Sequence, residues 1–383
     1  MKINLRILSV VLTAFIIAGI YLFNDISPVE KEGDSGFSVG SLMSDNSAGY
    51  KEASEQIKFV FPKDHAAHPE FKTEWWYFTG NIINEKGENF GYQLTIFRNA
   101  TSPVKPEISS NFLTNQIYSG HFAISDIKQE KFYHSEIIER EFYPFAYSDT
   151  AGFLVTAGGW KIEFNSDTNG ELPEILISAS DSIKSINFTL VPDKKPVFHG
   201  DNGLSPKSYK PGNASYYYSF TRLKTLGTMT INGDTHQISG NSWMDREWSS
   251  GALDKDQKGW DWFSIQLVDS TEIMFFRLRD FSGNTNFAKG TFIFKDGATR
   301  LLKNEDVTLH ATSNWKNSDG IFYPSSWTLR VPSIDLELNI NTSIPNQELK
   351  TFVNYYEGAI IITGIKSGVS ISGKGYVELT GYD

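Results

Sequence analysis

Apolar and polar residues alternate along much of this chain, and tight-turn signals separate the alternating stretches. The clearest stretch has four large apolar side chains at every second position, namely Phe90, Tyr92, Leu94 and Ile96. A period of two is typical of a β-strand with one face buried. Residues 228–231 lead into Asn232-Gly233 and residues 291–294 lead into Asp296-Gly297, both strong hairpin signals. Since no βαβ alternation is present, the pattern predicts an antiparallel barrel or sandwich and excludes dinucleotide-binding and P-loop folds.

The composition is typical of a folded β protein and excludes several classes of function. Aromatic residues make up 14% of the 383 residues, and 31 glycines supply turn positions. The formal net charge of −10 leaves no basis for a basic nucleic-acid-binding face, so no nucleic-acid partner is expected. The absence of cysteine excludes disulfides, thiolate metal sites and cysteine nucleophiles.

The N-terminus has the pattern of a membrane-targeting segment. Lys2 and Arg6 precede residues 7–23, which carry no charge. The run fits either a cleaved signal peptide or an uncleaved membrane anchor, and no small-residue cleavage site decides between them. We therefore expect residues 1–24 to be a signal peptide or signal anchor, residues 25–56 a flexible linker, and the rest an extracytoplasmic (periplasmic or secreted) protein that can be tethered to the inner membrane by residues 7–23.

A faint internal repeat suggests two copies of one barrel. Trp76-Tyr77-Phe78 can be aligned with Trp262-Phe263-Ser264, and each stretch leads to a second strand that ends in Phe-Arg. The repeat predicts an N-terminal domain over residues 57–238 and a C-terminal domain over residues 239–383.

Two clusters of aromatic and acidic residues are the candidates for chemistry. By strand parity Trp243, Asp245 and Glu247 point the same way, whereas Asp261 shares the more aliphatic face of its strand. A carboxyl group on an apolar face is either paired or protonated, and neighbouring acids form a coupled pair. We therefore take Asp245, Glu247 and Asp261 as the candidate catalytic residues. The candidate substrate-binding residues are Glu74, Trp75, Trp76, Tyr217, Trp243, Arg246, Trp248, Trp260 and Trp262.

Structural roles compete with each of these assignments. Asp245 and Glu247 could form ion pairs with Arg246, Arg277 or Arg279, Asp261 could cap a hairpin, and the tryptophans could be core. His65 and His68 have only loose metal-ligand spacing, so no metal and no cofactor are expected. No GxSxG or HExxH motif is present, which disfavours a standard serine or zinc hydrolase.

Several longer motifs carry a family resemblance. They are residues 68–80 (HPEFKTEWWYFTG), 211–219 (PGNASYYYS), 240–248 (GNSWMDREW), 259–263 (GWDWF) and 375–382 (GYVELTGY). In these motifs the chain resembles the two-domain lipocalin-like family of carotenoid 1,2-hydratase (hydroxyneurosporene synthase) and AttH-like proteins, in the branch labelled "predicted secreted hydrolase". The resemblance spans about residues 57–383. It implies an all-β chain with two consecutive lipocalin-like antiparallel β-barrel domains after an N-terminal membrane-targeting helix, with a ligand cavity at or near the interface of the barrels.

The resemblance also suggests a kind of chemistry. The hydratase members add water to the terminal double bond of an acyclic carotenoid without a cofactor. Such a reaction needs a protonated acid, aromatic faces beside the carbocation, and a dry pocket. In this chain Arg246 follows Asp245, where the hydratase pattern has a histidine, and Arg277 and Arg279 occupy the strand where its downstream acid would fall. A guanidinium at position 246 suggests recognition of an anionic group on the ligand.

Three hypotheses remain open. The first is an extracytoplasmic enzyme that acts on a hydrophobic isoprenoid- or lipid-like substrate by cofactor-free carboxylate acid/base chemistry, as a hydratase, cyclase or hydrolase. The second is a non-catalytic carrier of a hydrophobic small molecule or lipid. The third is an assembly role at the membrane. An enzyme should hold desolvated acids in its cavity, a carrier should have all of them in ion pairs, and an assembly protein needs no pocket.

Overall fold

The computed structural model describes residues 47–105, 113–165, 172–251 and 253–382. The predicted signal or anchor segment, and all but the last ten residues of the predicted linker, lie outside these residues. Within the described ranges, no helix is long and apolar enough to cross a membrane.

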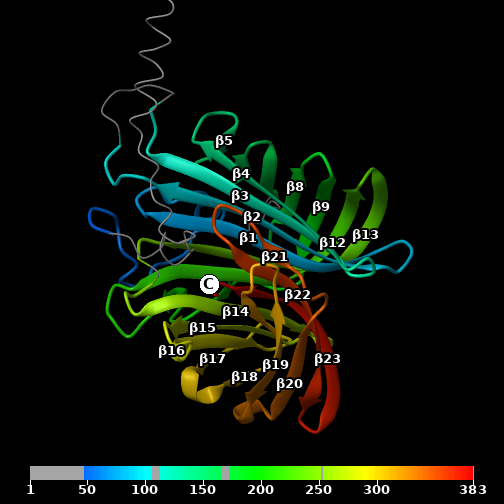
Figure 1. Cartoon of the computed structure of the whole chain (residues 1–383). Coiled ribbons are helices and arrows are strands. Elements are labelled where there is room, and N and C mark those ends of the chain that lie inside the picture. Colours follow the sequence, from blue (N-terminus) through cyan, green and yellow to red (C-terminus); the bar gives the residue numbers. More distant parts are fainter. Residues whose placement is uncertain (1–46, 106–112, 166–171, 252, 383) are drawn as a thin grey trace, which may run out of the picture. The chain divides into compact units, whose positions relative to one another are not determined.

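The first half of the chain forms one antiparallel sheet, in the order β4-β3-β2-β1-β13-β12-β9-β8-β7-β6-β5, with β10 and β11 paired to β12 (Figure 1). A short 3-10 helix, η1 (Lys63–His65), precedes it. The strands are β1 (Thr73–Asn84), β2 (Asn89–Ala100), β3 (Gln116–Asp126), β4 (Lys131–Arg140), β5 (Ala146–Ser148), β6 (Leu154–Ala157), β7 (Trp160–Asn165), β8 (Glu174–Ser180), β9 (Lys184–Pro192), β10 (Val197–Phe198), β11 (Leu204–Pro206), β12 (Ala214–Ile231) and β13 (Asp234–Ser249).

The second half forms a separate antiparallel sheet, in the order β17-β16-β15-β14-β23-β22-β20-β19-β18, with β21 paired to β22. Its strands are β14 (Gln257–Leu267), β15 (Glu272–Asp280), β16 (Thr285–Ile293), β17 (Thr299–Lys303), β18 (Thr308–Lys316), β19 (Phe322–Val331), β20 (Leu336–Thr342), β21 (Glu348–Leu349), β22 (Tyr355–Lys366) and β23 (Val369–Leu379). Two further 3-10 turns are η2 (Asn304–Asp306) and η3 (Pro332–Ile334).

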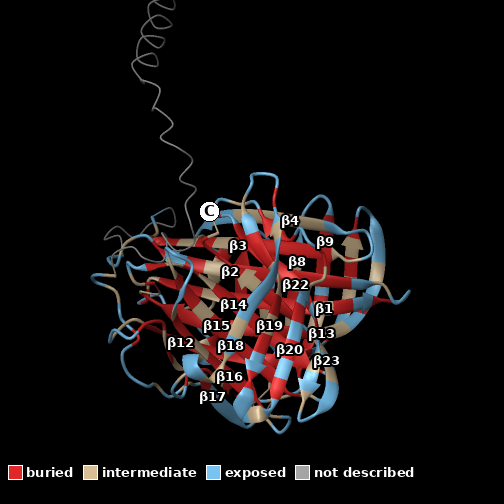
Figure 2. Cartoon of the chain, turned by 60° about the horizontal axis from the view of Figure 1, so that its bottom comes forward, coloured by how far each residue is buried: buried red, intermediate tan, exposed pale blue. Residues whose placement is uncertain are grey.

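The prediction of two lipocalin-like β-barrels is confirmed: the first sheet is a nearly closed barrel and the second is a half-barrel. Each curves around its own apolar core, which contains Trp76, Phe122 and Phe188 in the first and Phe263, Trp327 and Ile360 in the second. In Figure 2 buried residues run along the middle of the central strands, and exposed residues lie at the turns and along edge strands such as β18. This is the distribution that hairpin-connected strands around a core produce.

The change from one sheet to the other falls between Ser249 and Gln257. The predicted boundary between residues 238 and 239 therefore lies inside β13, which pairs with β1 and β12 of the first sheet. The Asn232-Gly233 turn is a hairpin within the first barrel, so it marks a strand connection rather than the end of that barrel.

A third apolar cluster lies where the outer faces of the two sheets meet. It contains Tyr77, Trp243, Trp262, Phe276 and Tyr376, drawn from strands of both sheets. Strand β1 is consequently buried on both faces, with Trp76 and Phe78 facing the barrel interior and Trp75 and Tyr77 facing the second sheet. Strand β9 has one solvent face and keeps a clean alternation of buried and more exposed residues.

The internal repeat is present, one residue out of the predicted alignment. In the first barrel Trp75 pairs with Phe97, and in the second Trp262 pairs with Phe276. The residue before each tryptophan is an acid that binds the arginine after each phenylalanine, as Glu74 binds Arg98 and Asp261 binds Arg277. Trp75, rather than Trp76, is therefore the counterpart of Trp262.

Candidate functional site

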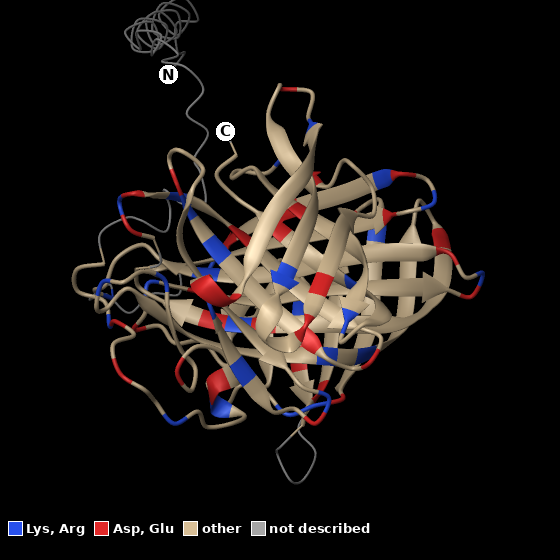
Figure 3. Cartoon of the chain, turned by 90° about the horizontal axis from the view of Figure 1, so that it is seen from below, with Lys and Arg blue, Asp and Glu red and all other residues tan. Residues whose placement is uncertain are grey.

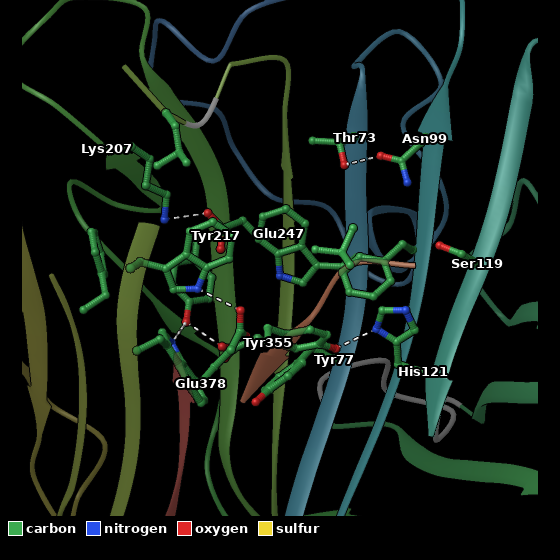
Figure 4. Close-up of a pocket in the computed structure, with 18 of the residues that line it drawn as sticks. Thr73, Tyr77, Asn99, Ser119, His121, Lys207, Tyr217, Glu247, Tyr355 and Glu378 are labelled. Carbon is green, nitrogen blue, oxygen red and sulfur yellow. Dashed lines mark hydrogen bonds and ion pairs between the residues drawn. The ribbon is translucent and has the colours of Figure 1, made fainter. Parts of the chain in front are cut away.

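A pocket lies between the two sheets, within the described residues, and has a volume of about 180 Å³. By the same kind of measure one water needs about 10–15 Å³, so the space fits a small organic molecule. The walls are mainly aromatic and aliphatic, as ligand pockets usually are. They are formed by Thr73, Trp75 and Tyr77 of β1, Phe97 and Asn99 of β2, Ser119 and His121 of β3, Glu136 and Ile138 of β4, Tyr217 of β12, Asp245 and Glu247 of β13, Trp260 and Trp262 of β14, Phe276 and Leu278 of β15, Tyr355 of β22 and Glu378 of β23, with Lys207, Leu253, Phe352 and Val353 from connecting segments (Figure 4).

Asp245 lies at the end of a directed chain of hydrogen bonds. Trp262 Nε1 donates to Tyr217 Oη at 3.0 Å, so the single phenolic proton of Tyr217 is donated to Asp245 Oδ2 at 2.6 Å. Trp243 Nε1 donates to Asp245 Oδ1 at 2.6 Å, and Ser219 Oγ also bonds this oxygen. Burial raises the pKa of Asp245 to about 7, although the three donors act in the opposite direction. Asp245 can therefore exist with or without its proton near neutral pH.

Glu247, two residues further along the same face of β13, is held in an ion pair. Lys207 Nζ lies 2.6 Å from its carboxylate, and Ser215 donates a hydrogen bond to it. The ammonium group of Lys207 also packs over the rings of Tyr217 and Phe276, at 5.0 and 4.5 Å from their centroids. Glu247 therefore supplies a fixed negative charge that its lysine balances.

Glu378 on β23 is a third pocket carboxyl group. Trp260 Nε1 donates to its Oε1 at 2.7 Å, and the described residues supply no second hydrogen bond to this side chain. Burial, together with the negative charges of Asp245 and Glu247, raises the pKa of Glu378 to about 8. The side chain is accordingly protonated at neutral pH.

A fourth carboxyl group lies directly across the strand pair from Glu378. Glu357 on β22 is its register partner, and Tyr77 Oη donates to Glu357 Oε2 at 2.8 Å. Burial and the neighbouring Glu378 raise the pKa of Glu357 well above its usual range. Two like charges this close cannot both persist away from water, so the pair keeps protons that exposed glutamates would lose.

The structure brings six of the twelve candidates together in the pocket, from β1, β12, β13 and β14. Asp245, Glu247, Trp75, Tyr217, Trp260 and Trp262 line the pocket, and Trp243 lies directly behind Asp245.

The other candidates lie on the opposite face of their strands, inside the first barrel. Glu74 binds both Arg98 and Arg246, and the guanidinium of Arg246 stacks over Trp76 at 4.0 Å and Trp248 at 5.1 Å. All five side chains are fully or almost fully buried. Arg246 is therefore ion-paired with Glu74, which it shares with Arg98, and does not face the ligand space, so the predicted recognition of a ligand anion by Arg246 has no support in the structure. A one-residue step along a strand reverses the face, which separates Trp75 from Trp76 and Glu247 from Arg246 and Trp248.

Asp261 also lies away from the pocket, on the inner face of the second barrel. It forms ion pairs with Arg277 at 2.7 Å and Arg279 at 2.9 Å, and Tyr382 Oη donates to it at 2.9 Å. The alternation predicted its face correctly, but that face is the half-barrel core. Asp261 thus forms the ion pairs with Arg277 and Arg279 that were considered for Asp245 and Glu247, rather than the hairpin cap considered for Asp261, and we remove it from the candidate catalytic set.

The sequence patterns did not predict Glu378 as a site residue, although the internal repeat contains a signal for it. In the first barrel Trp75 is paired across β1 and β13 with Glu247, and in the second Trp262 is paired across β14 and β23 with Glu378. The two glutamates are therefore counterparts, each beside a tryptophan on the face that meets the other sheet. Extending the repeat to the last strand of each barrel would have found Glu378.

In the described part of the chain, no group of three or more His, Asp or Glu side chains is arranged to hold a metal ion. His65 instead bonds Tyr218 Oη at 2.6 Å and stacks on Phe164, while His68 stacks on Trp248 at 3.9 Å between ring centroids. In Figure 3 basic and acidic residues are interspersed over the part of the chain that is coloured.

Comparison with known proteins identifies the family. The model of the AttH-like family matches residues 52–382. The chain belongs to the AttH-like family. Among solved structures, this AttH-like chain is similar to a candidate AttH from Nitrosomonas europaea, with 30% identity, a TM-score of 0.76, and coverage of 85% of this chain and 97% of the other.

More distant structures share the fold. The AttH-like chain is 16% identical to kievitone hydratase from Nectria haematococca, with a TM-score of 0.63 and coverage of 86% and 96% of the two chains. It is 11% identical to CghA crystallised with Sch210972, with a TM-score of 0.50 and coverage of 81% and 89%. Comparison with curated proteins gave no match.

Proposed function

We propose that this AttH-like protein is an extracytoplasmic enzyme that acts on a hydrophobic, isoprenoid- or lipid-like molecule by cofactor-free acid–base chemistry, as a hydratase, cyclase or hydrolase. One observation carries the proposal: a largely apolar pocket between the sheets holds carboxyl groups that burial keeps protonated, or half-protonated, at neutral pH. Enzymes tune carboxyl groups in this way to donate protons near pH 7.

Glu378 is the proposed proton donor. It is protonated at neutral pH, and Trp260 is its one hydrogen-bond partner among the described residues, so its proton can be offered to a ligand. Positive charge that develops on the substrate after proton transfer meets the ring faces of Trp260 and Trp262 in the pocket wall. The ionised form of Asp245, which unlike Glu247 has no lysine paired with it among the described residues, favours the same developing cation.

A hydrophobic-ligand carrier is the second candidate function, because the pocket would also suit binding alone. Glu247 fits a carrier, since Lys207 neutralises it. Within the described ranges Asp245 and Glu378 have no basic partner, since their hydrogen bonds come from hydroxyl and indole groups. Binding of a hydrophobic ligand does not require two desolvated acids without counter-charges. The presence of Asp245 and Glu378 beside the ion-paired Glu247 therefore favours an enzyme.

Location and substrate class rest on sequence. The positively flanked apolar run at residues 7–23 supports export or a membrane tether, with the membrane as partner through this segment. Kievitone hydratase, a protein of the same fold, is named for addition of water, which supports hydration as one of the reactions that this fold can host.

The test uses the full-length protein and extraction of its bound apolar molecules, followed by mass spectrometry. Wild type, Glu378→Gln and Asp245→Asn are each incubated in H₂¹⁸O with apolar extracts of the producing cells. The matched control is Glu337→Gln, an exposed glutamate paired with Arg330 on the far strands of the half-barrel.

We expect wild type and the control to convert a bound species, and Glu378→Gln and Asp245→Asn to accumulate it unchanged. ¹⁸O in the product identifies hydration or hydrolysis, and a product of unchanged mass identifies cyclisation. The same unconverted ligand in all four proteins would support the carrier and contradict the enzyme.

A further inference from the structure

Three pocket-lining side chains form a second hydrogen-bond chain that the proposed function has not used. His121 Nδ1 lies 2.6 Å from Tyr355 Oη, and His121 Nε2 lies 3.1 Å from Glu136 Oε1. His121 on β3 and Glu136 on β4 belong to the first sheet, whereas Tyr355 on β22 belongs to the second. The chain therefore bridges the two sheets at the pocket wall (Figure 4).

The chemistry of the three groups fixes the direction of the hydrogen bonds. The hydrogen bond from His121 lowers the pKa of Glu136, so Glu136 is an ionised acceptor, and the backbone N–H of Phe352 also donates to it at 3.1 Å. The proton of a neutral His121 consequently lies on Nε2, and its bare Nδ1 accepts from Tyr355. Burial raises the pKa of Tyr355 well above its usual range, so this side chain remains a phenol that donates.

Tyr355 also lies close to the proposed proton donor. Glu357 is the register partner of Glu378, and Tyr355 precedes Glu357 by two residues on the same strand face. Tyr355 and Glu378 are thus diagonal neighbours, whose backbones lie roughly 7–8 Å apart in such a ladder. Both side chains line the same pocket, on adjacent strands.

We propose that Tyr355, His121 and Glu136 form the proton-accepting centre of this pocket, which acts together with Glu378 on a ligand carrying a double bond or a hydroxyl group. The inference rests on the proposed function and assigns the group that completes the acid–base pair. Tyr355 is the residue that touches the reacting atoms. His121 takes the proton from Tyr355, and Glu136 is a positioning residue that holds the His121 tautomer.

The step balances in protons and charge. A water or ligand O–H gives its proton to Tyr355 Oη while the Tyr355 O–H proton moves to His121 Nδ1, which leaves an imidazolium beside the Glu136 carboxylate. Glu378 gives its proton to the other end of the double bond and becomes a carboxylate. Proton exchange with solvent then resets both groups. The reaction class is addition of water to a double bond, or its reverse, loss of water.

The first experiment measures proton abstraction with 5-nitrobenzisoxazole, an apolar probe that needs neither the natural substrate nor a proton donor. A base removes the C–H proton of its isoxazole ring, and the electron pair of that bond forms the nitrile as the N–O bond breaks, which gives a coloured cyanophenolate. General-base catalysis contributes about 10²–10⁴-fold, so we expect His121→Gln and Tyr355→Phe each to lower the rate at least about tenfold. Glu136→Gln should give a smaller loss, because the imidazolium then lacks its counter-charge.

The matched controls are His310→Gln on β18 and Tyr133→Phe on β4, neither of which lines the pocket, and both should retain the wild-type rate. An unchanged rate in His121→Gln, or a wild-type rate equal to that of buffer, overturns the proposal. An unchanged rate in Tyr355→Phe would contradict the role of Tyr355 in the accepting centre.

The second measurement needs no variant to fold. In ¹⁵N-histidine-labelled wild type, the nitrogen shifts of His121 should show a protonated Nε2 and an unprotonated Nδ1, a signature that a purely packing role does not require. The opposite tautomer overturns the proposal. If the probe rate depends on His121 while Glu378→Gln leaves ligand conversion unchanged, the accepting centre is supported and Glu378 is not the proton donor. If Glu378→Gln abolishes ligand conversion while His121→Gln leaves the probe rate unchanged, only the accepting centre is rejected.

Discussion

Replacing Glu378 by glutamine should stabilise the protein while abolishing its proposed activity. The pKa of Glu378 is about 8 in the folded chain, against an ordinary value of 4.5. At about 1.36 kcal/mol per pKa unit, this shift destabilises the folded state relative to a glutamate with the ordinary pKa by about 4–5 kcal/mol above pH 8 and by about 3 kcal/mol at pH 7. Because Glu378 is half-buried and water in the pocket screens part of its charge, these are upper values.

The sign follows from proton binding. Between pH 4.5 and 8 the folded protein holds a proton on Glu378 that the unfolded chain has released, so this group's contribution to stability falls as pH rises through that window. Glutamine has no proton to lose and keeps an oxygen that can accept the Trp260 indole N–H. The free energy of unfolding of the variant should therefore fall less steeply with rising pH than that of the wild type. The difference in slope should be roughly 1 kcal/mol per pH unit between pH 5.5 and 7.5, because one proton fewer is involved.

Urea unfolding of the full-length protein at several pH values measures this directly. Glu337→Gln is the control, since an exposed pair contributes about 0–1 kcal/mol and this substitution should leave the slope unchanged. If Glu378→Gln has the wild-type slope, or is destabilised by more than the control at pH 7, the reasoning that Glu378 is a desolvated acid is refuted.

Three other substitutions test the remaining architecture by the same unfolding assay. Asp261→Asn should destabilise by about 3–5 kcal/mol, because it removes the carboxylate that pairs with buried Arg279 and part-buried Arg277, yet it should leave ligand conversion in the pocket unchanged; lost conversion at wild-type stability would return Asp261 to the active site. Glu74→Gln should cost a similar amount of about 3–5 kcal/mol for the same reason, and a cost below that of the exposed Glu337→Gln control would contradict the buried network. Gly91→Val should cost about 1–3 kcal/mol, since a side chain there meets Ala359 of the other sheet at 2.6 Å; an unchanged stability would mean that the sheets do not approach closely at this point.

Much of the fold could be predicted from short-range pattern. The alternation in residues 90–96 marks β2, and the Asn232-Gly233 turn joins β12 to β13. The faces of Asp245, Glu247 and Asp261 also followed from parity, because successive side chains in a strand point to opposite sides. The predicted boundary between residues 238 and 239 lies inside β13, because the repeat on which it rests relates two matching strands and does not mark the segment that connects the sheets.

Parity assigns a residue to a face, but it does not say what that face meets. Asp261 and Glu247 both lie beside tryptophans in acidic, aromatic segments, yet one faces the half-barrel core and the other faces the pocket. Arg246 was placed near a ligand because the sequence could not show that Glu74, 172 residues away, would neutralise it.

The sequence by itself determined the strands, their faces, the repeated barrel and the membership of the AttH-like family, because these depend on local alternation, turn chemistry and contiguous motifs. Only the tertiary structure decided which acids keep their protons and which side chains form the accepting centre. Both depend on the two sheets closing over each other. The closure removes Glu378 from much of the solvent, and Tyr355 reaches His121, 234 residues earlier in the chain, only across it.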